Sequence, residues 1–185
     1  MKGSIRQADS RDLKAINGII ESAVMAWPLP ERVKRLSLPV LKYDSIDMEN
    51  LRMLVFERDG APGGEHGDEC GRVIAGVAAW GEEAPAGEQA LLHGLFVDPD
   101  LQGEGIGRAL QQAVFTQAEE LGMRAVVLRA ERVSIGYFES CGYEAVPPSP
   151  EAGNAYPYRY RKPLSADRTA LDGKDMRRTR PDAKT

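Results

Sequence analysis

The spacing of apolar residues along the chain predicts helices that alternate with strands. Residues 10–25 carry apolar side chains three and four positions apart, which is the period of an amphipathic helix. Asp9 stands before them as an N-cap, because its carboxylate can accept hydrogen bonds from the free amides of the first turn. The prolines of segment 27–39 confine any second helix to residues 31–36, since proline lacks a backbone N–H.

The clearest helix is predicted over residues 106–121. Its apolar positions line one face, and Gly122 follows where a left-handed residue commonly ends a helix. A shorter helix over residues 134–140 is closed by Gly142 in the same way. A glycine-rich hairpin loop is expected over residues 59–71. Short apolar runs predict strands at residues 4–8, 51–57, 73–80, 90–97, 125–128, 143–146 and 156–161.

One domain accounts for most of the chain. The length of 185 residues suits a single core, which we assign to residues 1–162. Hydrophobic residues make up 42% and charged residues 28% of the chain, as in ordinary globular proteins. Residues 163–185 are polar and lack periodicity, which predicts a disordered C-terminal tail.

Charge and cysteine content exclude several classes of protein. A net charge of -4 and a pI near 5.3 disfavour a nucleic-acid-binding surface. The longest apolar run, residues 73–80, is too short to cross a bilayer, and the N-terminus lacks the apolar core of a signal peptide. Cys70 and Cys141 form neither a disulfide framework nor a metal-ligand spacing. We therefore expect a soluble, cytoplasmic protein with no metal and no membrane partner; the sequence leaves a homodimer open.

A glycine-rich turn between a predicted strand and the long helix carries the strongest functional signal. Glycines let the backbone approach a ligand, and the first turn of a helix adds unpaired amides and the positive end of its dipole. Such a turn can hold a pyrophosphate, with an arginine at its mouth as an added cation. The predicted contacts are Gln102, Gly103, Gly105, Ile106, Gly107 and Arg108.

Two other phosphate-binding motifs do not fit this turn. A P-loop requires G-x-x-x-x-G-K-[ST], and neither lysine nor a hydroxyl residue follows Gly107. A dinucleotide-binding fingerprint requires G-x-G-x-x-G early in a βαβ unit, whereas Gly103, Gly105 and Gly107 alternate. A glycine-rich helix cap that binds no ligand is the remaining alternative.

The turn and its surroundings resemble the GCN5-related N-acetyltransferase (GNAT) family. Gln102-x-x-Gly105-x-Gly107 matches the family signature Gln/Arg-x-x-Gly-x-Gly/Ala, and LFVDP resembles the strand before it. Downstream, IGYFESCGY resembles the family element A-x-x-F-Y-E-x-x-G-F. The likeness covers most of residues 4–162 and is sharpest over residues 90–143.

This resemblance implies a fold and a cosubstrate. The fold is α/β, a mixed and mainly antiparallel sheet flanked by helices and splayed between strands 91–97 and 125–128. The loop amides would bind the pyrophosphate of acetyl-CoA. The pantetheine arm would add strand-like hydrogen bonds at the splay, near Leu95, Phe96 and Val97.

Acetylation of an amine needs a base, and His93 is the candidate. Its unperturbed pKa of about 6.5 suits proton transfer at neutral pH. Strand alternation predicts that it shares a face with Leu95 and Val97. The pattern L-H-x-L-x-V also resembles arylalkylamine N-acetyltransferases, in which a histidine here belongs to the proton relay. The alternative is a partly buried histidine bound to a nearby carbonyl; His66, in the glycine-rich loop, is expected on the surface.

The acid that protonates the leaving thiolate departs from the family pattern. The usual tyrosine position is Phe138, which has no proton to give. Tyr137 is the candidate substitute, although a helix turns it about 100° from Phe138. Cys141 and water are the alternatives. The family's asparagine after strand 125–128 is also replaced, with Glu131 near its place.

The acceptor pocket is expected between the loop after the first helix and residues 147–158. Glu21 or Glu83 is a candidate to pair with an amine, and the sequence does not choose between them. Candidate aromatic walls are Trp27, Tyr43, Tyr156 and Tyr158.

The leading interpretation is an acetyl-CoA-dependent N-acetyltransferase acting on a primary amine of a small molecule or peptide by direct attack on the thioester. The alternative is an acyl-CoA-binding regulator or scaffold with weak or no transferase activity. Phe138 at the tyrosine position favours the regulator, and His93 on the strand before the signature favours the enzyme.

Overall fold

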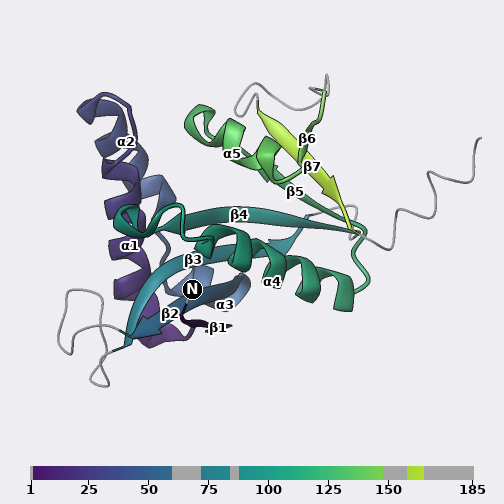
Figure 1. Cartoon of the computed structure of the whole chain (residues 1–185), viewed down its shortest axis with the longest axis horizontal. Helices are drawn as coiled ribbons and strands as arrows, with labels where there is room; N and C mark the ends of the chain where they lie inside the picture. Colours follow the sequence, from purple (N-terminus) through teal and green to yellow (C-terminus); the bar gives the residue numbers. More distant parts are fainter. Residues whose placement is uncertain (1, 60–71, 84–87, 148–157, 165–185) are drawn as a thin grey trace, which may run out of the picture.

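A seven-stranded sheet forms the centre of the molecule in a computed structural model that describes residues 2–59, 72–83, 88–147 and 158–164 (Figure 1). The strand order is β1-β2-β3-β4-β5-β7-β6, and only the β4–β5 pair is parallel. The α/β fold with a mainly antiparallel sheet is therefore confirmed. The strands are β1 Ser4–Gln7, β2 Arg52–Asp59, β3 Arg72–Glu82, β4 Gln89–Val97, β5 Ala125–Arg129, β6 Glu144–Ala145 and β7 Arg159–Pro163.

Helices cover both faces of this sheet. The helices are α1 Leu13–Met25, α2 Glu31–Leu41, α3 Ser45–Asn50, α4 Ile106–Glu120 and α5 Ile135–Ser140, with single 3-10 turns at Ser10–Asp12, Pro99–Leu101 and Arg132–Ser134. The apolar face of α1 packs with Val55 and Val77 of the sheet, whereas α4 packs with the alternate residues Leu54 and Ala78. Because successive strand residues point to opposite faces, α1 and α4 lie on opposite sides of the sheet.

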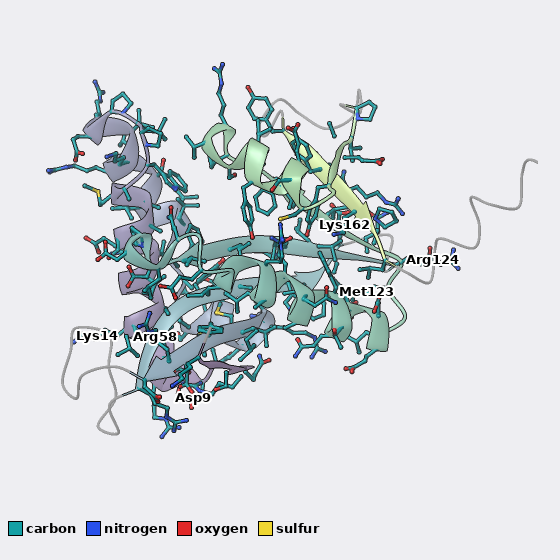
Figure 2. The ribbon with its side chains drawn as sticks, in the orientation of Figure 1. Asp9, Lys14, Arg58, Met123, Arg124 and Lys162 are labelled. Atoms are coloured by element: carbon teal, nitrogen blue, oxygen red, sulfur yellow. The ribbon has the colours of Figure 1, made fainter. Side chains whose placement is uncertain are left out.

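Local capping explains where the first helical segment begins. Asp9 accepts a hydrogen bond from the Arg11 amide at 2.8 Å, and the Asp9 amide donates to Asp12 at 2.7 Å. This reciprocal pair is a capping box, which satisfies amides that have no partner in the helix. The predicted start at Asp9 is confirmed (Asp9 is labelled in Figure 2).

The predicted end of α2 at Leu36 was wrong. The helix continues through Pro39 to Leu41. Proline removes one backbone donor, but Leu38 and Leu41 pack against the core on the α1 side and hold the last turn in place. Sequence reasoning also missed α3, where the Asp44 carboxylate accepts hydrogen bonds from the amides of Ile46 and Asp47.

The predicted splay at the centre of the sheet is confirmed. β4 pairs with β5 only from Gln89 to Leu92, opposite Ala125 to Leu128. Beyond that point the rest of β4 pairs with β3 alone among the described residues. The edge of β4 that faces β5 is therefore left open over residues 93–97.

The C-terminal side of the sheet is anchored around α5. Lys162 of β7 is labelled in Figure 2. It donates a hydrogen bond to the carbonyl of Cys141 at 2.6 Å, just past the end of α5. Pro163 pairs with Ala125, and Leu164 is buried in the core on the α4 side. The folded core thus reaches two residues past the predicted boundary at 162. The predicted loop 59–71 (apart from Asp59) and the predicted tail beyond Leu164 lie outside the described residues. Among the residues that are described, no helix is long and apolar enough to cross a membrane.

Candidate active site

A β-bulge at the splay presents His93. The register of β4 against β3 passes from Leu92 opposite Trp80 to Gly94 opposite Ala79, so His93 is an extra residue in β4. A bulge leaves its extra residue unpaired and re-aims the side chain. His93 stands where β5 leaves β4, at the start of the open edge.

The bulge overturns the prediction that His93 shares a face with Leu95 and Val97. Leu95 and Val97 pack against the core on the α4 side, whereas Phe96 belongs to the core on the α1 side. His93 lies with Phe96 in the wall of a cavity. One inserted residue reverses the alternation of a strand, so His93 points away from the two residues that alternation had placed beside it.

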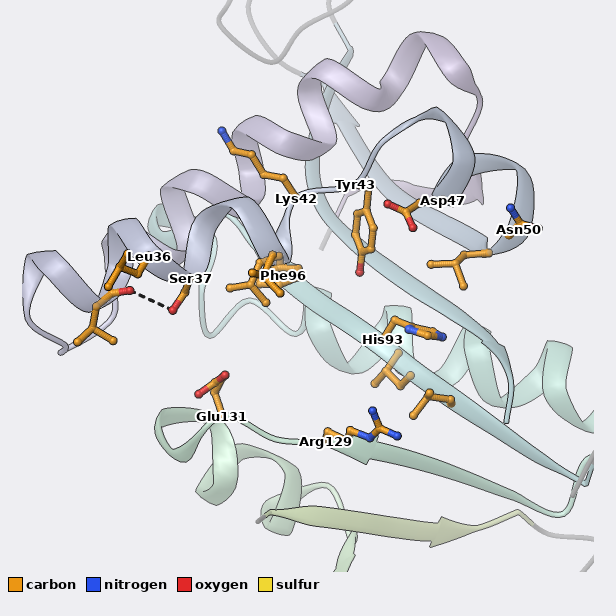
Figure 3. A pocket seen from close by; sticks show the side chains of 16 residues that line it. Leu36, Ser37, Lys42, Tyr43, Asp47, Asn50, His93, Phe96, Arg129 and Glu131 are labelled. Carbon is orange, nitrogen blue, oxygen red and sulfur yellow. Dashed lines mark hydrogen bonds between the residues drawn. The ribbon is translucent and has the colours of Figure 1, made fainter. Parts of the chain in front are cut away.

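The cavity has a volume of about 620 Å³ and lies on the α1 side of the splay, bounded by α2, α3, β4 and β5 (Figure 3). This size is typical of small-molecule sites. Part of its apolar wall comes from α2, where Val33, Leu36 and Val40 are 43%, 67% and 75% exposed. Its polar groups are Ser37, Lys42, Tyr43, Asp47, Asn50, His93, Arg129 and Glu131.

The surroundings of His93 lower its pKa and so favour the neutral imidazole. Partial desolvation lowers its pKa below the ordinary value, the positive charge of Arg129 lowers it further, and the Asp47 carboxylate opposes both. A histidine with a lowered pKa is largely unprotonated at pH 7 and can accept a proton. Asp47 and Arg129 were not predicted. They come from α3 and from the end of β5, far from His93 in sequence, and only the fold brings them together.

Tyr43 lines the cavity, and its side chain reaches from the segment after α2 toward β4 (Figure 3). The sequence named it as a candidate aromatic wall. Its backbone is fixed by Asn17, which accepts the Tyr43 amide at 3.0 Å and donates to its carbonyl at 2.8 Å. Its hydroxyl occupies the position that a side chain on Gly94 would take. Burial raises the pKa of Tyr43, so the hydroxyl stays protonated.

The glycine-rich turn lies at the N-terminus of α4, on the other side of β4. Gly103 and Gly105 have φ of +86° and +87°, which side chains disfavour, and no atom lies within 4 Å of the position a side chain would take. The first backbone bond of the helix runs from the Ala109 amide to the Gly105 carbonyl at 3.0 Å. Within the described chain, the amides of residues 105–108 have no acceptor, which leaves them to bind an anion.

Gly107 serves a different purpose from the other two glycines. It lies inside α4, and a side chain there would come within 2.7 Å of the Tyr137 hydroxyl. The Tyr137 hydroxyl also lies 2.7 Å from Nε2 of Gln111, one turn further along α4. The third glycine of the signature therefore makes room for a tyrosine from α5.

Tyr137 and Phe138 point in different directions, as their helical spacing predicts. Phe138 is buried, with its ring 5.5 Å from that of Tyr143, whereas Tyr137 is 40% exposed. Desolvation and the neighbouring Cys141 raise the pKa of Tyr137 to about 12, so its hydroxyl carries a proton at neutral pH. His93 and Tyr137 are not brought together: His93 faces the cavity, and Tyr137 faces the first turn of α4.

Several other candidates have partners or lie elsewhere. Glu21 is paired with Lys42 at 2.7 Å and Glu83 with Arg159 at 2.7 Å, and neither lines the cavity. Trp27 packs beside the core on the α1 side and Tyr158 on the α4 side. The described residues contain no cluster of metal-binding side chains. Three residues named from the sequence, His66, Cys70 and Tyr156, lie outside the described part of the chain.

The family of the chain is decided by a match over residues 21–143 to the model of the acetyltransferase (GNAT) family. The chain is a member of the GNAT family. A comparison with proteins of curated function gave no match. The N-acetyltransferases of this family are acyltransferases.

Solved structures share the GNAT fold at low sequence identity. PaiA N-acetyltransferase from Thermoplasma acidophilum, in complex with coenzyme A, is 14% identical with a TM-score of 0.68, over 89% of this chain and 100% of that one. The ribosomal-protein-S18-alanine N-acetyltransferase from Escherichia coli is 21% identical with a TM-score of 0.56, over 88% of this chain and 94% of that one. N-acetylglutamate synthase from Neisseria gonorrhoeae, in complex with coenzyme A and L-arginine, is 18% identical with a TM-score of 0.61, over 89% of this chain and 34% of that one.

Proposed function

We propose that this GNAT protein transfers the acetyl group of acetyl-CoA to a primary amine by direct attack on the thioester. The observation that carries the proposal is the open edge of β4, which separates an anion-binding turn on one side from a cavity containing a neutral histidine on the other. A donor that is held at the turn and reaches through the splay would present its thioester to that cavity.

Coenzyme A would bind along the open edge. The amides at the start of α4 suit its pyrophosphate, with Gln102 and Arg108 beside them on the exposed turn. The backbone of residues 95–97 has no partner from β5 and can bond the amide groups of the pantetheine arm, as an added strand would. Two solved GNAT structures that share the fold contain coenzyme A.

The acceptor amine would enter the cavity and react beside His93. Most amines are protonated at neutral pH, so the nitrogen must lose a proton before or during attack. His93 is the proposed base, because its lowered pKa leaves a ring nitrogen able to take that proton. The cavity wall carries two carboxylates, Asp47 and Glu131, alongside the two cations Lys42 and Arg129, and either carboxylate could pair with an ammonium group.

Tyr137 is the proposed source of the proton that the leaving thiolate takes. It stands on the donor side of β4, and its pKa of about 12 keeps it protonated throughout the physiological range. Phe138, at the family's usual tyrosine position, is turned into the core. The proposal therefore moves the acid by one residue along α5.

The acceptor would be a small molecule or the amino terminus of a peptide. Of the structures that share the fold, one is named for acetylation of a protein alanine and one was solved with an amino acid. Phe138 favours a second candidate, an acyl-CoA-binding regulator without efficient transfer. Thiol release from acetyl-CoA across a set of primary amines separates the two, since the regulator predicts binding without amine-dependent release.

A further inference from the structure

Gln111 is a polar residue in an apolar setting. It lies on α4, is 2% exposed, and is one of three polar or charged residues that are buried in the described part of the chain. An amide that is removed from water is costly unless its donors and acceptor find partners. Lys34, another of the three, is explained by its bond to the carbonyl of Met25 at the end of α1.

The partner of Gln111 is the Tyr137 hydroxyl. Nε2 of Gln111 donates to that oxygen at 2.7 Å and makes a longer contact of 3.7 Å with the sulfur of Cys141. A hydroxyl that accepts a hydrogen bond still has its own proton to donate. Gln111 thereby fixes the position of the oxygen. The phenolic proton can be donated to the sulfur of Cys141, which also hydrogen-bonds this hydroxyl, or to a bound ligand.

We propose that Gln111 is a positioning residue that holds Tyr137 as a hydrogen-bond donor to the sulfur of bound coenzyme A, in place of the tyrosine missing at Phe138. This inference rests on the proposed function. The absent side chain of Gly107 gives the hydroxyl its place beside α4, close to Val97 at the end of the open edge. Tyr137 is 40% exposed, so a bound ligand can reach it.

The nitrogen lone pair attacks the thioester carbonyl carbon, an N–C bond forms, and the C–S bond breaks with its electron pair passing to sulfur. The surplus proton of the amine goes to His93 and later to water. The phenolic proton of Tyr137 goes to sulfur and gives the free thiol, and the phenolate recovers a proton from water.

The test measures the affinity for coenzyme A against pH, because a donor aimed at sulfur favours the thiolate. S-methyl-coenzyme A cannot ionise at sulfur. It therefore serves as the reference ligand, because pH effects that both ligands share drop out of the ratio of their affinities. If binding lowers the pKa of the coenzyme A thiol by about one unit, the affinity ratio of coenzyme A to S-methyl-coenzyme A should rise severalfold between pH 7 and pH 9. Isothermal titration calorimetry provides both dissociation constants.

Three variants locate the effect. Tyr137→Phe and Gln111→Met should both flatten the ratio, since one removes the donor and the other its support. Gln112→Met, at the exposed neighbouring position of α4, should keep the wild-type rise. The side-chain amide of Gln111, followed by NMR in the wild type and in Tyr137→Phe, reports the hydrogen bond even if Gln111→Met does not fold, and its signals should move when the phenol is lost.

Different failures have different meanings. The inference is overturned if the affinity ratio does not rise with pH in the wild type, or if the rise survives in Gln111→Met. In either case, acetylation of amines by the wild type would leave the proposed function standing. An unchanged Gln111 amide signal in Tyr137→Phe also overturns it. If neither ligand binds at either pH, the proposed function fails and this inference falls with it.

Discussion

His93 and Tyr137 face opposite sides of strand β4. The bulge turns His93 into the cavity bounded by α2 and α3, while the Tyr137 hydroxyl lies against Gly107 in the first turn of α4. A reaction that uses both must therefore take place through the sheet, at the splay. This arrangement separates the two proton transfers in space: the amine loses its proton on one side, and the thiolate gains one on the other.

Replacing His93 by glutamine should lower kcat by roughly 100-fold or more, as expected for loss of a positioned base. In the wild type, kcat at saturating substrate should fall as the pH drops through the pKa of His93, because protonation removes the base. That pKa is lowered, so the fall lies below the ordinary histidine value of about 6.5. If His93→Gln kept both the wild-type kcat and the fall of kcat at acidic pH, His93 would not be the base. As a control, the affinity of His93→Gln for coenzyme A should match that of the wild type.

Gly105→Ala should weaken coenzyme A binding. The residue has a φ of +87°, and the new methyl group would project into open space at the proposed pyrophosphate site. Gly122→Ala is the matched control, because Gly122 has a φ of +75° at the far end of α4. Both variants should lose about 1 kcal/mol of unfolding free energy to backbone strain. Only Gly105→Ala should bind coenzyme A less tightly in calorimetry; equal affinities would remove the turn from the cofactor site.

The contact between Gly94 and Tyr43 predicts a pair of variants. In Gly94→Ala the methyl group would collide with the Tyr43 hydroxyl and approach within 2.7 Å of the Phe96 ring. The cavity wall must shift, so the KM for the acceptor should rise several-fold while coenzyme A affinity stays near that of the wild type. Adding Tyr43→Phe removes one of the two collisions and should recover part of the loss. Steady-state kinetics of Gly94→Ala and of the double variant check this. An unchanged KM for the acceptor in Gly94→Ala would argue against Tyr43 as a wall of the acceptor site.

The apolar wall of the cavity can be tested on α2. Leu36 lines the cavity and is 67% exposed, whereas Ile46 on α3 is 65% exposed and does not line it. Aspartate at either position should change the unfolding free energy by less than about 0.5 kcal/mol, because both side chains are largely in water already. Leu36→Asp should alter the KM for the acceptor and Ile46→Asp should not. The same change in both would mean that the acceptor does not touch α2.

Much of this architecture was predictable because its signals are local. The helix starting at Ile106, its glycine-rich turn and the N-cap at Asp9 each depend on a few adjacent residues, and each was confirmed. The bulge at His93 was not predictable, since nothing in LLHGLFV marks an extra residue and alternation gave the wrong face. α2 was predicted too short because local proline rules do not include the packing of Leu38 and Leu41.

The chemistry around the site depended on contacts distant in sequence. Asp47 and Arg129 act on the pKa of His93 from two different elements, and no spacing rule links them. Gln111 was hidden among the apolar positions of α4, where a single glutamine carries no signal until the Tyr137 hydroxyl is placed beside it. The sequence could identify the turn that would hold the donor, and it could not show how the cavity on the other side was assembled.

Amine-dependent thiol release from acetyl-CoA tests the central claim most directly. With the wild-type protein and a set of primary amines at pH 7.5, at least one amine should raise the release of free thiol well above the rate without amine, and His93→Gln should abolish the increase. Tight binding of acetyl-CoA with no amine-dependent release from any member of the set would contradict an acetyltransferase and support the acyl-CoA-binding regulator.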